Sequence, residues 1–278
     1  MTVIQALLRQ RHRYYRNLLI VEVIALIGLR SLQQAPQLVS LVYLVISSVS
    51  VLADTPLLPG KRLNPLLNRN PLPVRSQERL QHIFQRRLWL AKGWLIAAAL
   101  ELCWQASLLM SPALAVQLSV LHIVVWLGLL LYVLWTLVNA LAEEPMFSSS
   151  LLMGAAAGYL LIGFTGGIML NSLLVLDPAA FHLPANVHPH LPVGIAHAPQ
   201  MLGAAFGSLT TLGSAVLNPE SLTSVSASVG ITIVGQLYVA ILIAGVLGKP
   251  RQLAAVRKAA HRRSQDGGTS PRLRRNRR

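Results

Sequence analysis

The sequence predicts an all-α membrane protein with six transmembrane helices and a shorter re-entrant helix and loop between the fifth and the sixth. The first observation is composition: 54% of the 278 residues are hydrophobic and 12% are charged, which is roughly half the charged fraction of a soluble domain. The second is a set of apolar runs close to the ~20 residues that a helix needs to cross a bilayer. They cover residues 17–32, 36–53, 88–110, 115–142, 150–176 and 223–247.

The third observation is the placement of the basic residues. Of the 24 lysines and arginines, four precede residue 17, seven lie in residues 61–87 and eleven follow residue 248. None lies between residues 93 and 248. Because cytoplasmic segments carry an excess of lysine and arginine, six crossings that begin inside place all three basic segments in the cytoplasm. We therefore expect an integral, multi-pass protein with both termini cytoplasmic.

The basic segments also divide the chain. We expect a cytoplasmic arm and two spans over residues 1–53, a basic, proline-containing cytoplasmic linker over 54–87, and the third and fourth spans over 88–146. Two more spans with the loop between them occupy 147–248, and a basic, disordered cytoplasmic tail covers 249–278. The charge runs are expected to contact anionic headgroups, at about 1 kcal/mol per basic residue, rather than nucleic acid. The fourth run contains no arginine, which argues against a voltage sensor.

The first apolar run is the least regular. It is short, contains Glu22 and follows the basic arm, so a cleaved signal peptide is the alternative to a membrane span. Cleavage would leave the later topology unchanged, and charge placement does not separate the two. Glu22, Lys92 and Glu101 are the ionisable residues expected to be buried in the first four runs. They are either functional groups within the membrane or side chains that pair in the bundle or reach its edge. Cys103 is the one cysteine, which excludes a disulfide within a single chain.

Residues 199–219 lie between the last two runs and are too short and broken to cross a bilayer. Pro199 suits the first turn of a helix, because its missing amide hydrogen is not needed there, and about a dozen mostly apolar residues follow. We expect a half-helix and then an extended segment over residues 210–213. Non-helical backbone at membrane depth is tolerated only where protein buries it or where it lines a water-filled path. The segment therefore predicts a pore loop, since a half-helix followed by free carbonyls is how ion filters are built.

Residues 158–251 resemble the pore domain of bacterial potassium channels. The resemblance rests on Gly158-Tyr-Leu-Leu-Ile-Gly163, on Ser208-Leu-Thr-Thr-Leu-Gly213, on Pro219 and on the run that begins at Gly235. It implies an outer helix, a pore helix, a filter and an inner helix, with four chains around one ion path. It also implies a location in a bacterial plasma membrane.

The predicted filter follows the family motif in its first half only. Against Thr-Val-Gly-Tyr-Gly, Thr211 takes the place of the threonine, Leu212 of the valine and Gly213 of the first glycine. Ser214 stands where the family has an aromatic residue that braces the filter, and Ala215 stands where it has the second glycine. An alanine in a left-handed conformation costs roughly 1–2 kcal/mol per chain, so the outer ion sites are expected to be weaker than the inner ones. The predicted filter comprises Thr210, Thr211, Leu212, Gly213, Ser214 and Ala215.

Gly235 and the loop histidines are further candidates. Gly235 lies where the resemblance places a hinge of the inner helix, and the alternative is a glycine that lets two helices pack closely. The outer loop contains His182, His188, His190 and His197. His188 and His190 could ligate zinc or titrate near neutral pH, although loop histidines without a ligand are the commoner case.

The resemblance implies a homotetrameric, potassium channel-like protein that mediates passive cation transport, with potassium as the permeant ion, relaxed selectivity, no cofactor and no enzymatic chemistry. The alternative is a non-conducting relative of the pore domain that acts as a regulatory or assembly subunit, because its filter departs from the motif. An intramembrane serine protease is not favoured, since Ser208 lacks a Gly-x-Ser-Gly sequence and the sixth run has no histidine. We find no internal repeat of the kind typical of secondary transporters.

Overall fold

The structure is a computed structural model that describes residues 3–54, 74–110, 112–142, 149–184, 188 and 191–266. Within these ranges it is all-helical, as predicted, and contains no strand. The longer helices are α1 (Val3–Ile27), α3 (Val39–Asp54), α5 (Val74–Met110), α6 (Pro112–Ala142), α7 (Ser149–Leu176), α9 (Ala198–Leu209) and α10 (Leu222–Asp266). The short helical turns are α2 (Leu29–Leu32), η1 (Pro36–Leu38), η2 (Pro178–Ala180) and α8 (Val193–Ala196).

Three helices in the described ranges are long and apolar enough to cross a membrane. They are Gln117–Leu141 in α6, Ser149–Leu176, which is the whole of α7, and Leu222–Ala244 in α10. The segment Pro36–Val51, in η1 and α3, is apolar but shorter. A membrane-embedded protein is therefore supported, whereas the arrangement with six spans stays a prediction.

Two helices extend into segments that we expected to be irregular. α5 begins at Val74, inside the predicted linker and directly after its last proline, Pro73. α10 continues to Asp266, inside the tail that we expected to be disordered. Both extensions combine arginine and glutamine with leucine or alanine, which are good helix formers, so the basic charge does not mark the helix ends. Residues 267–278 lie outside the described residues.

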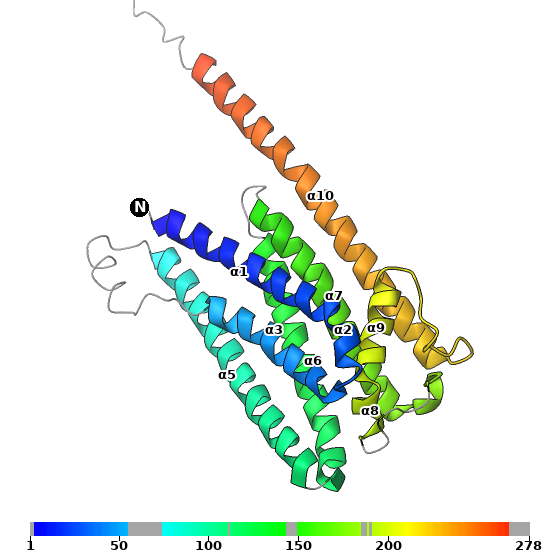
Figure 1. Cartoon of the computed structure of the whole chain (residues 1–278). Helices are drawn as coiled ribbons and strands as arrows, with labels where there is room; N and C mark the ends of the chain where they lie inside the picture. The colour runs from blue at the N-terminus through cyan, green and yellow to red at the C-terminus, as the bar shows by residue number, and fades with distance from the viewer. Residues whose placement is uncertain are drawn as a thin grey trace, which may run out of the picture.

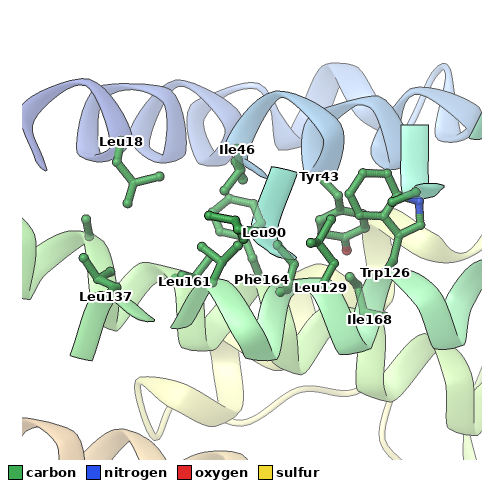
Figure 2. Packing of buried hydrophobic residues seen from close by; sticks show 14 of the residues in the cluster. Leu18, Tyr43, Ile46, Leu90, Trp126, Leu129, Leu137, Leu161, Phe164 and Ile168 are labelled. Atoms are coloured by element: carbon green, nitrogen blue, oxygen red, sulfur yellow. The ribbon is translucent and has the colours of Figure 1, made fainter. Parts of the chain in front are cut away.

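α1, α3, α6 and α7 pack around a shared hydrophobic core (Figure 2). Leu18 of α1, Ile46 of α3, Leu137 of α6 and Phe164 of α7 are all buried in it. Tyr43 meets Phe164 edge to face, with 6.4 Å between the ring centroids, an arrangement that adds about 0.5–1.5 kcal/mol to the burial of the rings. This core joins the front helices, α1, α3, α5 and α6, to α7.

A second core joins α7 to α9 and α10. It buries Leu170 and Leu174 of α7, Met201 and Leu209 of α9, and Ile231 of α10. α7 therefore contributes to both cores and connects the front helices to the region of the predicted pore loop.

The helix ends that flank the basic segments lie at the same end of the molecule. Figure 1 shows the beginning of α1, the end of α3, the beginning of α5 and the distal part of α10 there. α2, α8 and the C-terminal end of α5 lie toward the opposite end. α9 starts near α8, at this opposite end.

Candidate functional site

α9 lies antiparallel along α7 and ends near its middle. The Cα of Leu202 would stand 3.1 Å from a Cβ built on Gly167, and four residues later the ring of Phe206 covers Gly163 in the same way. These two glycines allow close approach of the helices, as small residues do in membrane bundles. α9 has 12 residues, which is about 18 Å at 1.5 Å per residue, against about 30 Å of hydrocarbon in a bilayer. The helix is therefore too short to span.

After α9 the chain returns toward the end of α7 from which α9 started (Figure 1). The amide of His182 donates to the Val216 carbonyl at 2.8 Å, and Phe181 forms an isolated antiparallel bridge with Leu217. Phe181 follows directly after η2, close to the C-terminal end of α7. α9 and residues 210–221 thus form a half-helix and loop that begin and end beside the same end of α7.

The last carbonyls of α9 are held by the two neighbouring helices. The Tyr159 hydroxyl of α7 donates to the Leu209 carbonyl at 3.1 Å, and the Thr232 hydroxyl of α10 donates to the Ser208 carbonyl at 2.8 Å. The Ser208 hydroxyl also lies 2.9 Å from the Ser228 hydroxyl of α10. Because the last carbonyls of a helix lack partners within it, the bond from Tyr159 satisfies a group that would otherwise be orphaned, and the bonds from α7 and α10 together fix the end of α9.

The predicted filter begins as a turn rather than as the extended segment that we expected. The Thr210 amide and hydroxyl both donate to the Phe206 carbonyl, at 3.0 and 2.7 Å, and the Thr211 amide donates to the Ser208 carbonyl at 3.1 Å. These amide bonds continue the helical pattern for one turn past the end of α9. Thr211 has a φ of 64° and Gly213 a φ of 74°. A positive φ is a genuine outlier for a β-branched residue, costs roughly 1–3 kcal/mol, and is a kind of strain that gathers at functional sites.

Beyond this turn the loop offers free hydrogen-bond acceptors. The Thr211 hydroxyl and the carbonyls of Thr211 and Leu212 make no hydrogen bond within the ranges that the structure describes. The Leu212 side chain is 86% exposed. These atoms belong to the half of the predicted filter that follows the family motif, and a single chain leaves them open.

The second half of the predicted filter folds back on α9. The Gly213 carbonyl lies against Gly207, where a Cβ would collide with it, and the Gly213 amide donates to the Gly207 carbonyl at 3.0 Å. The Ser214 hydroxyl accepts a hydrogen bond from the Val216 amide at 3.3 Å, and Ala215 is exposed. The acceptors of the first half thus have no hydrogen-bond partner among the described residues, whereas the carbonyl of Gly213 points at its own half-helix.

Gly235 lies inside α10, which continues on both sides of it. A Cβ at this position would meet the Leu209 side chain. Glycine therefore lets α10 pack closely on the end of α9, which is the second of the two interpretations for this residue. Hinge motion at Gly235 stays a prediction.

Of the four outer-loop histidines, the structure describes His182, His188 and His197. His188 Nε2 lies 3.2 Å from the Gln33 carbonyl, His182 is exposed and His190 lies outside the described residues. In the part of the chain that is described, no group of three or more His, Cys, Asp or Glu side chains could hold a metal ion. His197 is buried between α8 and α9, and this burial lowers its pKa below the usual 6.5.

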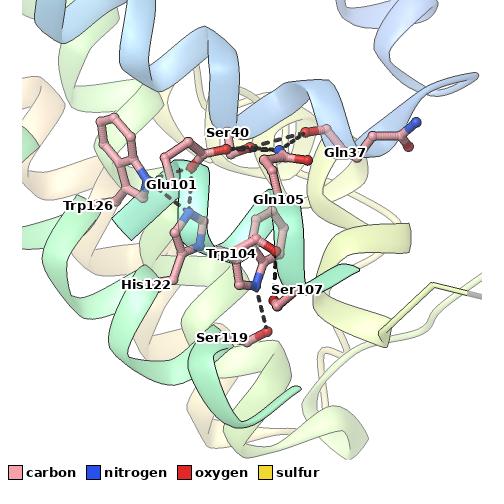
Figure 3. Close-up of polar contacts among 9 residues, drawn as sticks. All are labelled: Gln37, Ser40, Glu101, Trp104, Gln105, Ser107, Ser119, His122 and Trp126. Carbon is pink, nitrogen blue, oxygen red and sulfur yellow. Dashed lines mark hydrogen bonds and ion pairs between the residues drawn. The ribbon is translucent and has the colours of Figure 1, made fainter. Parts of the chain in front are cut away.

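A buried polar cluster lies between α3, α5 and α6 (Figure 3). The Glu101 carboxyl group accepts hydrogen bonds from Ser40 Oγ at 2.6 Å, Gln105 Nε2 at 2.9 Å and Trp126 Nε1 at 3.1 Å, and its Oε2 lies 2.6 Å from His122 Nε2. Glu101 is therefore paired within the bundle, one of the two interpretations that the sequence left open. His122 could not be singled out from the sequence, because one histidine in an apolar run forms no pattern.

The other two ionisable residues that we expected to be buried, Glu22 and Lys92, have different surroundings. Glu22 of α1 is fully buried, and neither carboxyl oxygen has a hydrogen-bond partner among the described residues. Lys92 of α5 lies over the ring of Trp89, with its Nζ 5.7 Å from the ring centroid. Such a cation–π contact contributes about 0.5–1 kcal/mol at an exposed site.

α10 presents an apolar face that no other described element covers. Val225, Val229, Ile233, Leu237 and Ile241 are between 38% and 70% exposed. Their spacing of four residues places them along one face of the helix. An apolar surface of this length requires lipid or another protein surface next to it.

No protein-family model matches the chain, and neither a curated protein nor a solved structure matches it.

Proposed function

We propose that the chain forms a homotetrameric, potassium channel-like pore for passive cation transport, with potassium as the permeant ion. The observation that carries the proposal is α9 with its loop, a 12-residue helix that ends beside the middle of α7 and is followed by free acceptors on Thr211 and Leu212. Rings of backbone carbonyls replace the hydration shell of a cation in potassium-channel filters. The partial negative charge at the carboxyl end of a half-helix also favours a cation nearby.

In this proposal α1, α3, α5, α6, α7 and α10 cross a bacterial plasma membrane and α9 is the re-entrant helix. Two observations support this topology. The helix ends beside the basic segments lie at one end of the molecule (Figure 1), which fits the cytoplasmic side. α8 and the beginning of α9 lie toward the opposite end, where the described connections contain Arg30 of α2 as their one basic residue.

Assembly of several copies follows from the position of the free acceptors. One loop cannot enclose an ion path, whereas four loops around a common axis can, as in potassium channels. The exposed Leu212 and the apolar face of α10 defined above provide surfaces for such neighbours. The partners in this proposal are three further copies of the chain and the anionic headgroups of the bilayer.

A specific observation favours the second candidate function, a non-conducting regulatory or assembly subunit. The carbonyl of Gly213 points at Gly207 instead of away from α9, so one ring of filter carbonyls is missing unless the loop rearranges on assembly. The residues that follow, Ser214 and Ala215, also depart from the family motif. Both candidates require assembly around the loop, and they differ in ion flux.

Cross-linking tests the assembly of several chains around the loop, which both candidate functions require. With Cys103→Ser as the background, Leu212→Cys should form disulfide-linked dimers in the membrane, because a common axis brings these side chains together. The matched control is Leu121→Cys, which replaces an exposed leucine of α6, 53% accessible, that faces no predicted axis. Equal cross-linking of the two variants, or monomers alone in native mass spectrometry from lipid nanodiscs, would contradict the proposal.

A further inference from the structure

A cavity of about 420 Å³ lies between the front helices and the beginning of α9. Most of the side chains that line it are apolar or aromatic, and they include Trp104 of α5, Trp126 of α6, Ile168 of α7 and Ile195 of α8. Ala198, the first residue of α9, lines it as well. The volume lies within the range of about 300–1,000 Å³ that is typical of small-molecule sites.

The Tyr43 hydroxyl lies on the wall of this cavity and has no partner. Tyr43 lines the cavity from α3, and its oxygen makes no hydrogen bond among the described residues. The residue keeps 7% of its surface accessible, and its hydroxyl is not among the unpaired polar atoms that their neighbours enclose. Figure 2 shows this oxygen on the side of Trp126, whose ring centroid lies 6.4 Å from that of Tyr43. A molecule in the cavity can therefore reach the hydroxyl.

Other donors around the cavity are committed to protein acceptors. Ser40 Oγ and Trp126 Nε1 donate to the Glu101 carboxyl group, at 2.6 and 3.1 Å. Trp104 Nε1 donates to Ser119 Oγ at 3.2 Å. Figure 3 shows these bonds, with both indole rings beside the Glu101 cluster. These three donors are not available to a ligand, whereas the hydroxyl of Tyr43 is.

We propose that this cavity binds an uncharged molecule of about two rings whose carbonyl oxygen accepts a hydrogen bond from Tyr43 Oη. An apolar cavity of about 150 Å³ holds one benzene molecule, so 420 Å³ leaves room for two rings and a carbonyl group. A phenol hydroxyl is both donor and acceptor, but it donates more strongly because its ring delocalises the oxygen lone pair. An acceptor on the ligand is therefore the better match.

The other lining residues fit an uncharged, flat ligand. The described residues of the wall include no Asp, Glu, Lys or Arg, so a charged ligand would be buried without a counterion. The indole rings of Trp104 and Trp126 suit the faces of aromatic rings. None of residues 210–213 lines the cavity, so binding does not depend on ion conduction. The ligand would contact α3 and α6 as well as α8 and Ala198, and would thereby link the front helices to the beginning of α9.

Two matched probes test the hydrogen bond. Benzophenone has a carbonyl group between two phenyl rings, and diphenylmethane has a methylene group in its place. Near-ultraviolet light makes the benzophenone carbonyl insert into a neighbouring C–H bond, so perdeuterated benzophenone labels the site and the two unlabelled probes compete with it. In wild-type protein in nanodiscs, we expect benzophenone to compete at about five- to tenfold lower mole fraction in the bilayer, the usual contribution of one hydrogen bond. Equal competition would overturn the proposal and indicate that the cavity selects hydrocarbon alone.

Tyr43→Phe tests the donor. This variant removes the hydroxyl and keeps the ring that packs on Trp126 and Phe164, so the two probes should compete equally. The matched control is Tyr14→Phe in α1, whose hydroxyl donates to Ser50 Oγ at 3.4 Å and does not line the cavity. The control should keep the preference for benzophenone. A preference that persists in Tyr43→Phe would refute the assignment of the donor.

A filled variant locates the site. Ile123→Phe places a larger side chain in the cavity from α6 and should reduce labelling. Val175→Phe does the same from α7 and replaces the first variant if that variant does not fold. The control is Leu131→Phe on the exposed side of α6, which should leave labelling unchanged. Full labelling of the filled variant, or label found only on peptides that do not line the cavity, would refute the site.

Discussion

The packing of α9 on α7 predicts a large difference between two substitutions that look alike in the sequence, Gly163→Ala and Gly128→Ala. A Cβ on Gly163 would meet three ring carbons of Phe206, two of them at 2.5 and 2.8 Å. Ordinary contacts between carbon atoms begin at about 3.5 Å, so the ring or α9 must move by about an ångström. A Cβ on Gly128 in α6 would meet nothing within 4 Å.

The difference between the two variants isolates the packing contribution. Both replace glycine by alanine inside a helix, which by itself stabilises by about 1 kcal/mol, and this gain cancels in the comparison. Overpacking in a filled core costs typically about 1–3 kcal/mol. We therefore expect Gly163→Ala to be less stable than Gly128→Ala by about 1–3 kcal/mol, measured by denaturant unfolding of purified protein in mild detergent.

A second substitution tests the cause. Phe206→Leu shortens the side chain that the new methyl group meets, so it should recover most of the loss in the Gly163→Ala background. Residues in contact give coupling energies of about 0.5–3 kcal/mol, whereas independent sites add within about 0.5 kcal/mol. Equal stabilities of the two alanine variants, or additive effects of Gly163→Ala and Phe206→Leu, would refute the packing of α9 on α7.

Three further predictions follow from the cluster, the buried histidine and the loop. Glu101→Ala should lower the free energy of unfolding by about 3–5 kcal/mol, because it leaves buried donors and a histidine without their partner. The control, Leu102→Ala at the exposed neighbouring position, should change the free energy of unfolding by less than about 1 kcal/mol. Similar effects of the two substitutions would contradict the pairing of Glu101. Burial lowers the pKa of His197, so at low pH the unfolded chain binds more protons than the folded chain, and stability should fall as pH drops below about 6.5. His197→Gln should flatten this pH dependence in thermal unfolding. An unchanged slope would count against a role of His197 in it. Ser214→Tyr with Ala215→Gly should raise potassium over sodium selectivity in liposome flux, because the family motif has an aromatic residue that braces the filter and a second glycine. Glycine permits the left-handed backbone of that motif, which Ala215 does not adopt in this structure. Unchanged selectivity would separate this loop from the family motif.

The sequence predicted the helices of the loop region well because local residues determine them. The half-helix was expected from Pro199 and the apolar residues after it, and α9 covers Ala198–Leu209. The long helix after the loop was expected from its apolar run, and α10 begins at Leu222. For both helices, the residues that determine the helix start, a proline in α9 and an apolar run in α10, lie in the helix itself or within a few residues of it.

The atoms that fix the loop could not be predicted, because they come from distant parts of the chain. The Tyr159 hydroxyl reaches the Leu209 carbonyl across 50 residues, and no pattern in either segment indicates the pair. The expected extended conformation of residues 210–213 was wrong, since the amides of Thr210 and Thr211 turn back to the carbonyls of α9. A motif comparison gives the order of residues in a filter but not the direction in which each carbonyl points.

Ion flux tests the central claim, that Thr211 and Leu212 line a cation path. Tetrameric wild-type protein in liposomes should release potassium or rubidium faster than protein-free liposomes, and Thr211→Ala should lower this flux because it removes a free hydroxyl of the loop. The matched control is Thr136→Ala in α6, whose hydroxyl donates within its own helix to the Val133 carbonyl at 2.8 Å and which should leave the flux unchanged. Wild-type tetramers that conduct no more than empty liposomes would contradict the pore and leave the non-conducting subunit as the function.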